Sequence, residues 1–248
     1  MSAGMEIAAI GLRAQQQALD SIASNVTNIN TPTYKRSDLR FSELLVAPPL
    51  AGNDGLNAVN LTTRPMVDQQ GQLQVTGNAL DLAINGNGFI ELMGSSGRTM
   101  LWRGGTLQVQ EDGTLATSSG YQLKTSVTVP KGAANLTINP DGKVYATASG
   151  STTPTQIGQI NMVEVPASVA ISRMDGGVYQ VTDGSQLSET VPGEDNLGNL
   201  VQGEQEQSNV DLNTEMVNLL VSQRAYAASA QVVQAADQLY SLANSLRR

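Results

Sequence analysis

Helical apolar patterns occur only at the two ends of this sequence, and this placement limits the folds that the chain can adopt. Near the N-terminus, small or apolar residues alternate at spacings of three and four, which is typical of the seam of a coiled coil. The seam consists of Met5, Ala8, Leu12, Leu19, Ile22, Val26 and Ile29, with Gln15 in the remaining gap. We expect a helix over roughly residues 3–28, about 40 Å long.

The second pattern begins at SNVD, residues 208–211, where Ser208 is the expected N-cap and Asp211 completes a capping box. Two adjacent seams then run toward the C-terminus. One consists of Leu212, Met216, Leu219, Tyr226, Ala230, Val233 and Tyr240, and the other of Ala225, Ser229, Val232, Ala236, Leu239, Ala243 and Leu246. Two seams indicate burial over a wide face, more than a two-stranded pairing requires.

Between these ends the sequence alternates apolar and polar residues in short runs, which is typical of strands. TLQVQEDGTLATS and LTINPDGKVYAT each centre on an Asp-Gly pair, Asp112-Gly113 and Asp141-Gly142, and both predict hairpins. Because no long helical pattern separates the strands, the sheet should be antiparallel, of sandwich or barrel type.

The predicted fold class is therefore α+β, with long terminal helices that pair as a coiled-coil-like bundle and a central all-β domain. The expected parts are an N-terminal helix and turn (1–46), a linker that ends in a strand (47–77), the β-rich domain (78–207) and the C-terminal helix (208–248).

Charge separates the same parts. The net charge is −8, and residues 47–207 hold the whole excess, with seven basic and fifteen acidic residues. Nucleic-acid binding requires Lys and Arg to replace counterions, so an acidic middle argues against it. The sequence contains no run of 18 apolar residues, so we expect no membrane insertion. The N-terminus lacks the basic and apolar regions of a secretory signal, so no cleaved signal peptide is expected.

The composition lacks two residue types that often carry catalysis in enzymes. The chain has no Cys and no His, which excludes thiol and imidazole catalysis and most zinc sites. Its adjacent carboxylates, Glu111-Asp112 and Glu194-Asp195, lie in polar, turn-like stretches. We predict no catalytic residue, no cofactor and no metal, and a protein that is not an enzyme.

Four stretches resemble signatures of the bacterial flagellar rod and hook proteins. QQQALDSIASNVTNINTPTYKR resembles the N-terminal signature, although Pro32-Thr33 stands where a small residue and Gly are more usual. DLAINGNGFIEL (81–92) and GTLQVQEDGTLATSSGYQL (105–123) resemble motifs of the β-domain, and QSNVDLNTEMVNLLVSQRAYAASAQVVQAADQL (207–239) resembles the C-terminal signature. The length and the continuous last helix look most like a distal rod subunit, with a proximal rod or short hook subunit as the alternative.

The resemblance implies a subunit of a helical tube that crosses the periplasm and transmits motor torque. The implied partners are other copies of the chain, neighbouring rod and hook axial proteins and the flagellar export apparatus. The terminal helices would form the inner tube, and the implied assembly residues are Leu12, Leu19, Ile22, Val26, Asn28, Asn30, Leu212, Met216, Leu219, Gln223, Arg224, Tyr226, Val233 and Leu239. The β-domain motif is represented by Asp81, Gly86, Gly88 and Phe89.

NVTNINTPTYKR, residues 25–36, is expected to end the first helix and turn the chain, with Lys35 and Arg36 meeting acidic neighbours. Its deletion should abolish assembly and leave the β-domain folded. One rival hypothesis is a non-catalytic binding module, in which the two helices form a stable intramolecular hairpin. Another is an envelope enzyme that uses carboxylates alone.

Overall fold

The computed structural model describes residues 3–43, 59–94, 98–125, 127–148, 150, 153–166, 169–174, 176–181, 187–194 and 196–246, in places by backbone alone. The chain forms two compact units. Unit 1 comprises residues 1–29, 37–64 and 210–248, and unit 2 comprises residues 30–36 and 65–209.

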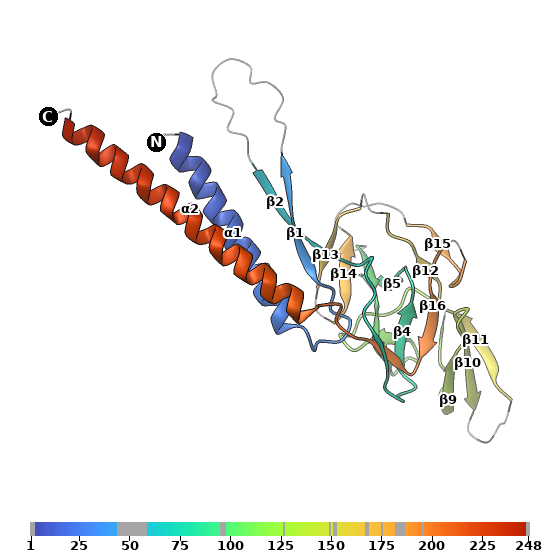
Figure 1. Cartoon of the computed structure of the whole chain (residues 1–248). Helices are drawn as coiled ribbons and strands as arrows, with labels where there is room; N and C mark the ends of the chain where they lie inside the picture. Colours follow the sequence, from blue (N-terminus) through green and yellow to red (C-terminus); the bar gives the residue numbers. More distant parts are fainter. Residues whose placement is uncertain are drawn as a thin grey trace, which may run out of the picture. The chain divides into compact units, whose positions relative to one another are not determined.

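Unit 1 contains both long helices, α1 (Ala3–Thr27) and α2 (Leu212–Leu246), and a two-stranded ribbon of β1 (Ser37–Glu43) and β2 (Val59–Pro65). The two helices lie against each other, and β1 contacts α1 (Figure 1). Two terminal helices are therefore confirmed. No described helix combines the length and apolarity needed to span a membrane.

The start of α2 differs from the prediction. Asp211, not Ser208, is the N-cap: its Oδ2 accepts hydrogen bonds from the backbone N–H of Thr214 at 2.9 Å and from the Thr214 hydroxyl at 2.5 Å. The residues before Asp211 are bound to other segments of unit 2. For example, Gln207 N–H donates to Gln72 O at 2.8 Å. A backbone engaged in this pairing cannot enter the first helical turn.

Unit 2 is built from short strands in small sheets. They are β3 (Leu73–Val75), β4 (Asp81–Asn85), β5 (Ile90–Met93), β6 (Thr99–Trp102), β7 (Gly104–Val109), β8 (Leu115–Thr117), β9 (Ala133–Ile138), β10 (Lys143–Ala148), β11 (Thr155–Gln159), β12 (Met162–Val163), β13 (Ile171–Arg173), β14 (Val178–Val181), β15 (Glu189–Thr190), β16 (Asn199–Gln202) and β17 (Glu204–Glu206). The sheet orders are β16-β4-β7-β8, β13-β14-β6-β5, β11-β10-β9, β12-β15 and β17-β3. Their ladders are antiparallel, as predicted.

Both Asp-Gly hairpins are confirmed. β7 pairs with β8 across Asp112-Gly113, and β9 pairs with β10 across Asp141-Gly142. Gly113 has φ +84° and Gly142 has φ +82°, a left-handed conformation that glycine adopts without steric cost.

The sheet β13-β14-β6-β5 has apolar side chains on both faces, because successive strand residues point to opposite sides. Trp102 and Val178 belong to the main core, which they share with Leu82, Leu107 and residues of the β9–β11 sheet. Leu101 and Tyr179, one position along in each strand, belong to a second core cluster. This double coverage explains how a unit with few aromatic residues holds together.

Candidate functional site: the terminal helices and the buried charge cluster

Small residues line part of the contact between α1 and α2. A Cβ atom added to Gly11 would lie 4.0 Å from the Ser229 hydroxyl, and Ala14 of α1 is buried. Ser222, Ala225 and Ser229 of α2 are half-buried. Short side chains let two helix backbones approach closely, so the intramolecular pair uses only one side of α2.

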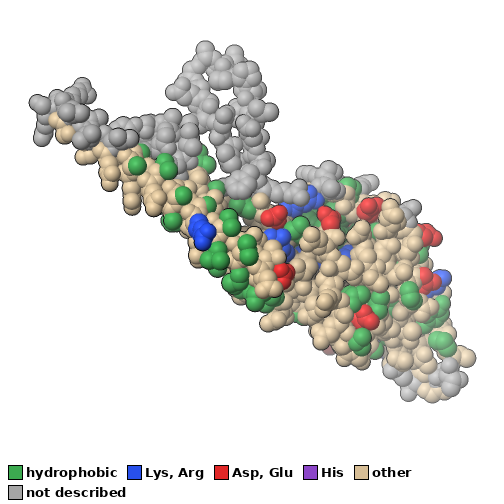
Figure 2. Space-filling view, viewed as in Figure 1, with side chains coloured by type: hydrophobic (Ala, Val, Ile, Leu, Met, Phe, Trp, Pro, Cys, Tyr) green, Lys and Arg blue, Asp and Glu red, His purple; other side chains and the backbone are tan. Residues whose placement is uncertain are grey.

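A large part of the apolar surface of α2 remains exposed. Val217, Leu220, Val221 and Val232 are each more than half exposed, at 56–61%. Leu212, Met216 and Tyr226 are also exposed. Figure 2 shows apolar side chains along this helix. Because exposed apolar surface of this extent on one element is unusual in a monomer, it marks a surface for protein contacts.

The Asn-rich end of α1 has defined partners. The Asn25 amide donates to Ser37 O at 3.0 Å and its oxygen accepts from Ser37 N–H at 2.9 Å, so one side chain satisfies both backbone groups at the start of β1. Asn28 donates to Ser24 O at 2.8 Å, and Thr27 to Ala23 O at 2.8 Å. Ser24 O also accepts from the Asn28 backbone N–H at 3.1 Å, so these side chains add second bonds to carbonyls near the end of the helix.

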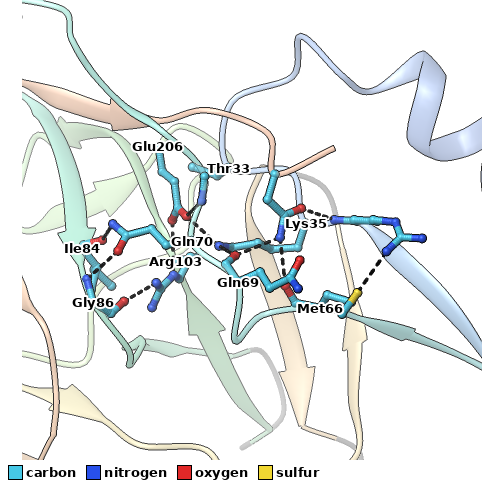
Figure 3. Close-up of polar contacts among 12 residues, drawn as sticks. Thr33, Lys35, Met66, Gln69, Gln70, Ile84, Gly86, Arg103 and Glu206 are labelled. Carbon is cyan, nitrogen blue, oxygen red and sulfur yellow. Dashed lines mark hydrogen bonds and ion pairs between the residues drawn. The ribbon is translucent and has the colours of Figure 1, made fainter. Parts of the chain in front are cut away.

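A buried charge cluster in unit 2 joins residues far apart in the sequence. Lys35 Nζ lies 2.6 Å from Glu206 Oε1, and Arg103 Nε lies 3.3 Å from Glu206 Oε2, with all three side chains at most 1% exposed. Gly71 N–H donates to the same carboxylate at 2.7 Å, and Lys35 also donates to Gln69 O at 2.7 Å (Figure 3). Burial lowers the pKa of Lys35. The negative charge of Glu206 acts in the opposite direction, but the effect of burial is larger.

Asn209 closes the same region through its side chain. Its Oδ1 accepts from Arg36 N–H at 2.6 Å, and its Nδ2 donates to Met66 O at 3.1 Å and Gln69 O at 2.8 Å. Asn209 belongs to the SNVD stretch of the C-terminal signature, and Arg36 is the last residue of the N-terminal signature. This hydrogen bond therefore joins the two signatures. The expected acidic neighbour of Lys35 is confirmed, and the guanidinium of Arg36 contacts Met66 Sδ at 3.5 Å.

The NGNG motif is built around Arg103. This guanidinium donates to Gly86 O and to Gly88 O, and its carbon lies 5.7 Å from the Phe89 ring centroid. Both glycines have positive φ, +116° and +114°. A Cβ on Gly86 would lie 2.8 Å from the backbone Cα of Gly198, which cannot swing aside as a side chain can, so only glycine fits at that position.

Asp81, the first residue of the DLAINGNGFIEL stretch, is a buried hydrogen-bond acceptor. Thr76 Oγ1 donates to it at 2.6 Å, Thr106 Oγ1 at 2.7 Å and Asn78 Nδ2 at 3.1 Å. Burial by itself would raise its pKa, but hydrogen bonds from Thr76, Thr106, Gln205 and Asn78 outweigh that effect and hold the pKa of Asp81 below its ordinary value. Its role is to fix the start of β4.

The structure places the predicted assembly residues differently from one another. Ile22 is buried; Leu12, Leu19, Val26, Asn28, Leu219 and Val233 are half-buried; Asn30, Leu212, Met216, Gln223, Arg224 and Tyr226 are exposed. The side chain of Leu239 lies outside the described residues, as do those of Met5, Ala8, Tyr240, Ala243 and Leu246. In the seam that begins at Leu212, exposed and half-buried side chains are thus equally frequent among those described. In the other seam Ala225, Ser229 and Ala236 are half-buried and Val232 is exposed.

Glu206 and Arg103 were not predicted as site residues. Their partners lie up to 171 positions away, so no local pattern marks them. Among the described residues, His, Cys, Asp and Glu form no group of three or more that could hold a metal ion.

Three family profiles match the chain in succession. "Flagella basal body rod protein" matches residues 5–35, "Flagellar hook protein FlgE/F/G D1 domain" residues 83–146 and "Flagellar basal body rod FlgEFG protein C-terminal" residues 201–246. They cover most of α1 with its turn, the part of the β-rich unit from β4 to β10, and the end of that unit with α2. Fold and profiles together define a structural protein of the flagellar rod and hook class.

Curated relatives extend over nearly the whole chain. The flagellar basal-body rod protein FlgG of Buchnera aphidicola (subsp. Schizaphis graminum) is 32% identical over 249 residues, 94% of this chain and 95% of the relative. FlgG of Agrobacterium fabrum is 32% identical over 254 residues, 96% and 97% of the two chains. The flagellar hook protein FlgE of Brucella abortus matches 113 residues at 37% identity, 46% of this chain and 28% of the relative. The chain therefore belongs to the flagellar basal-body rod proteins, in the FlgG family.

Proposed function

We propose that this rod subunit polymerises through α1 and α2 into the inner helical tube of the distal rod, with its β-rich unit on the outside. The tube would cross the periplasm and transmit motor torque, in contact with further copies and with neighbouring rod and hook axial proteins. The observation that carries the proposal is the apolar surface of α2 that α1 leaves exposed.

That surface consists of two strips, and their positions favour an open polymer over a closed dimer. Leu212, Met216 and Leu220 recur every four residues and form the first strip. Val217, Val221 and Val232 form the second strip, about 140° around the helix at roughly 100° per residue.

The half-buried Ser222 and Ser229 lie on the third side of α2, toward α1. Two different strips on one helix suit heterologous contacts with two neighbours. Such contacts build rings or open helical filaments, because the same patch does not face itself. The coiled-coil-like bundle expected from the sequence would then be completed between copies.

The charges of the helical segments are compatible with such packing. Residues 208–248 contain three basic and three acidic residues, so repeated copies would add no net charge to the tube. Of the four segments expected from the sequence, 1–46 and 208–248 would serve assembly, 47–77 would be the connection and 78–207 the outer domain, with residues 30–36 and 65–77 grouped with the outer domain. We further propose that the flagellar export apparatus delivers the chain, and that the chain acts as a structural subunit without catalysis.

The binding-module hypothesis also requires that α1 and α2 pack together, so their contact does not separate the two functions. The exposed apolar strips of α2 do separate the two functions, because a monomeric binding module does not require apolar surface for contacts between copies. No observation in the described part of the structure favours the binding module over the rod.

A charge placed on each strip tests the proposal. Leu220→Asp and Val221→Asp should each prevent the formation of long filaments, which negative-stain electron microscopy and sedimentation at rising protein concentration would record. Gln108→Asp adds the same charge at an exposed position of the β-rich unit, outside the proposed tube contacts, and should leave filaments intact. Filaments of unchanged length from either strip variant would contradict the proposed tube contacts.

A further inference from the structure

Residues 30–36, here called the N-terminal peptide, belong to unit 2 although residues 37–64 of unit 1 separate them from the remainder of that unit in the sequence. Tyr34 is fully buried, and Thr33 is 4% exposed. A peptide that merely connects two units would leave such side chains in solvent. This one contributes two of them to the interior.

Backbone hydrogen bonds tie the peptide to two other segments of unit 2. Thr33 N–H donates to Glu206 O at 2.7 Å, which engages the end of β17. Met66 N–H donates to Arg36 O at 2.7 Å, which engages the segment before β3. The peptide is therefore held between residues 66–72 and residues 204–209, with both of which it also shares side-chain bonds.

Side chains lock the same three segments. Glu206 accepts from Lys35 of the peptide, from Gly71 and from Arg103, so one carboxylate joins four parts of the chain (Figure 3). The Arg173 guanidinium lies 3.8 Å from the centroid of the Tyr34 ring and covers the peptide from β13. Removing one member of a buried ion pair leaves an uncompensated charge, which is strongly destabilising.

We propose that the N-terminal peptide is the closing element of the β-rich unit, and that the Lys35–Glu206–Arg103 cluster makes the stable fold of that unit conditional on both ends of the chain. Residue 35 lies near the start and residue 206 near the end of the sequence. The unit therefore reaches full stability only when almost the whole chain is available. This replaces the expectation that deletion of residues 25–36 leaves the β-domain folded.

The consequence for assembly rests on the proposed function. A subunit delivered from one end would keep its outer unit incompletely closed until the segment just before α2 arrives. Closure of the outer unit and availability of α2 for the tube would then coincide, which disfavours the stable folding of partial chains away from the assembly site.

Trp102 gives a selective readout of unit 2, because it is the single Trp of the chain and is 1% exposed in the main core. We expect Lys35→Met in the full chain to lower the urea midpoint of the Trp102 fluorescence transition by about 1–2 M. Lys131→Met removes the same charge at an exposed site of unit 2 and should leave the midpoint within about 0.2 M. Equal midpoints for Lys35→Met and the unmodified chain would overturn the proposal.

Hydrogen exchange of the unmodified chain provides a second test that does not depend on the folding of a variant. If the peptide closes the unit, the Thr33 amide should exchange within about tenfold of the Leu107 amide, which lies in the core sheet. Exchange of Thr33 faster by a factor of about a thousand or more would show a peptide that detaches by itself, and would refute the closing role. Neither result depends on filaments, so failure here is distinct from failure of the rod assignment.

Discussion

At the scale of single residues, the polar groups that matter most are those whose charge or conformation is unusual for their surroundings. Lys35 and Glu206 are buried ions, Asp81 is a buried carboxylate, and Thr33 has φ +60° although it is not glycine. Thr33 stands where the rod and hook signature more usually has Gly, and the positive φ gives the physical reason. A β-branched residue at positive φ is sterically strained.

Replacement of Thr33 by Gly should relieve this strain. We expect Thr33→Gly to raise the free energy of unfolding of unit 2 by about 1 kcal/mol, because a left-handed conformation costs a non-glycine residue roughly 1–2 kcal/mol and glycine's greater unfolded-state entropy offsets part of the gain. Urea titration of Trp102 fluorescence measures the change. Thr31→Gly, at an exposed position without positive φ, is the control and should not stabilise.

The lowered pKa of Asp81 predicts that the stability of unit 2 decreases in acid. The pKa of Asp81 is lower in the folded chain than in the unfolded chain. The stability that it contributes is therefore complete above its unfolded pKa of about 3.9 and is lost as pH falls from there through the folded value.

Asp81→Asn should accordingly lower the urea midpoint of the Trp102 fluorescence transition at pH 7. Below about pH 4 this midpoint should decrease less steeply with falling pH than in the unmodified chain. Asp112→Asn, in an exposed hairpin turn, is the comparison because Asp112 also has a lowered pKa, caused first by its Thr114 hydrogen bond. A steep acid transition that survives in Asp81→Asn would show that other carboxylates control it.

At the scale of secondary-structure elements, the ends of α1 and α2 are fixed by different devices. α1 ends where Asn25 binds the Ser37 backbone, and α2 begins where Asp211 caps Thr214. Ser208 fits the capping pattern equally well in sequence, but its neighbours Gln207 and Asn209 are bound to unit 2. Tertiary hydrogen bonds thus chose between two plausible caps.

Asp211→Ala should therefore loosen the first turn of α2. We expect faster hydrogen exchange at the Thr214 amide, which loses its carboxylate acceptor, with little change at amides in the middle of the helix. Ser208→Ala should leave Thr214 exchange unaltered. If Ser208→Ala instead produces the faster exchange, the cap has been assigned to the wrong residue.

At the scale of the whole molecule, charge and apolar surface are divided between parts of the chain. Residues 47–207 hold all of the net charge of −8, whereas α2 carries the two exposed apolar strips. Neighbouring copies in a polymer would bring these acidic regions near one another, and their repulsion is screened by salt.

Filament formation should consequently be favoured by moderate salt. Raising the ionic strength from about 0.01 M to 0.15 M shortens the Debye length from roughly 30 Å to 8 Å, so the concentration needed for filaments should fall. Light scattering during a dilution series in each buffer measures that concentration. A higher critical concentration in salt would indicate that contacts between opposite charges, rather than apolar strips, drive assembly.

The sequence by itself determined the elements with regular periodicity. The seams from Leu12 to Val26 and from Leu212 to Val233 predicted two helices, and Asp112-Gly113 and Asp141-Gly142 predicted hairpins, since each depends on residues close in the chain. The same patterns and motifs identified the family.

Only the tertiary structure decided which distant segments meet. It placed residues 30–36 in the β-rich unit, brought Lys35, Arg103 and Glu206 together, and left the two apolar strips of α2 exposed while α1 covered another side. Such contacts join residues up to 171 positions apart, and a local pattern of apolar and polar residues contains no information about them. The physical reason is that a buried charge is tolerable only beside its partner, and the whole fold decides where that partner lies.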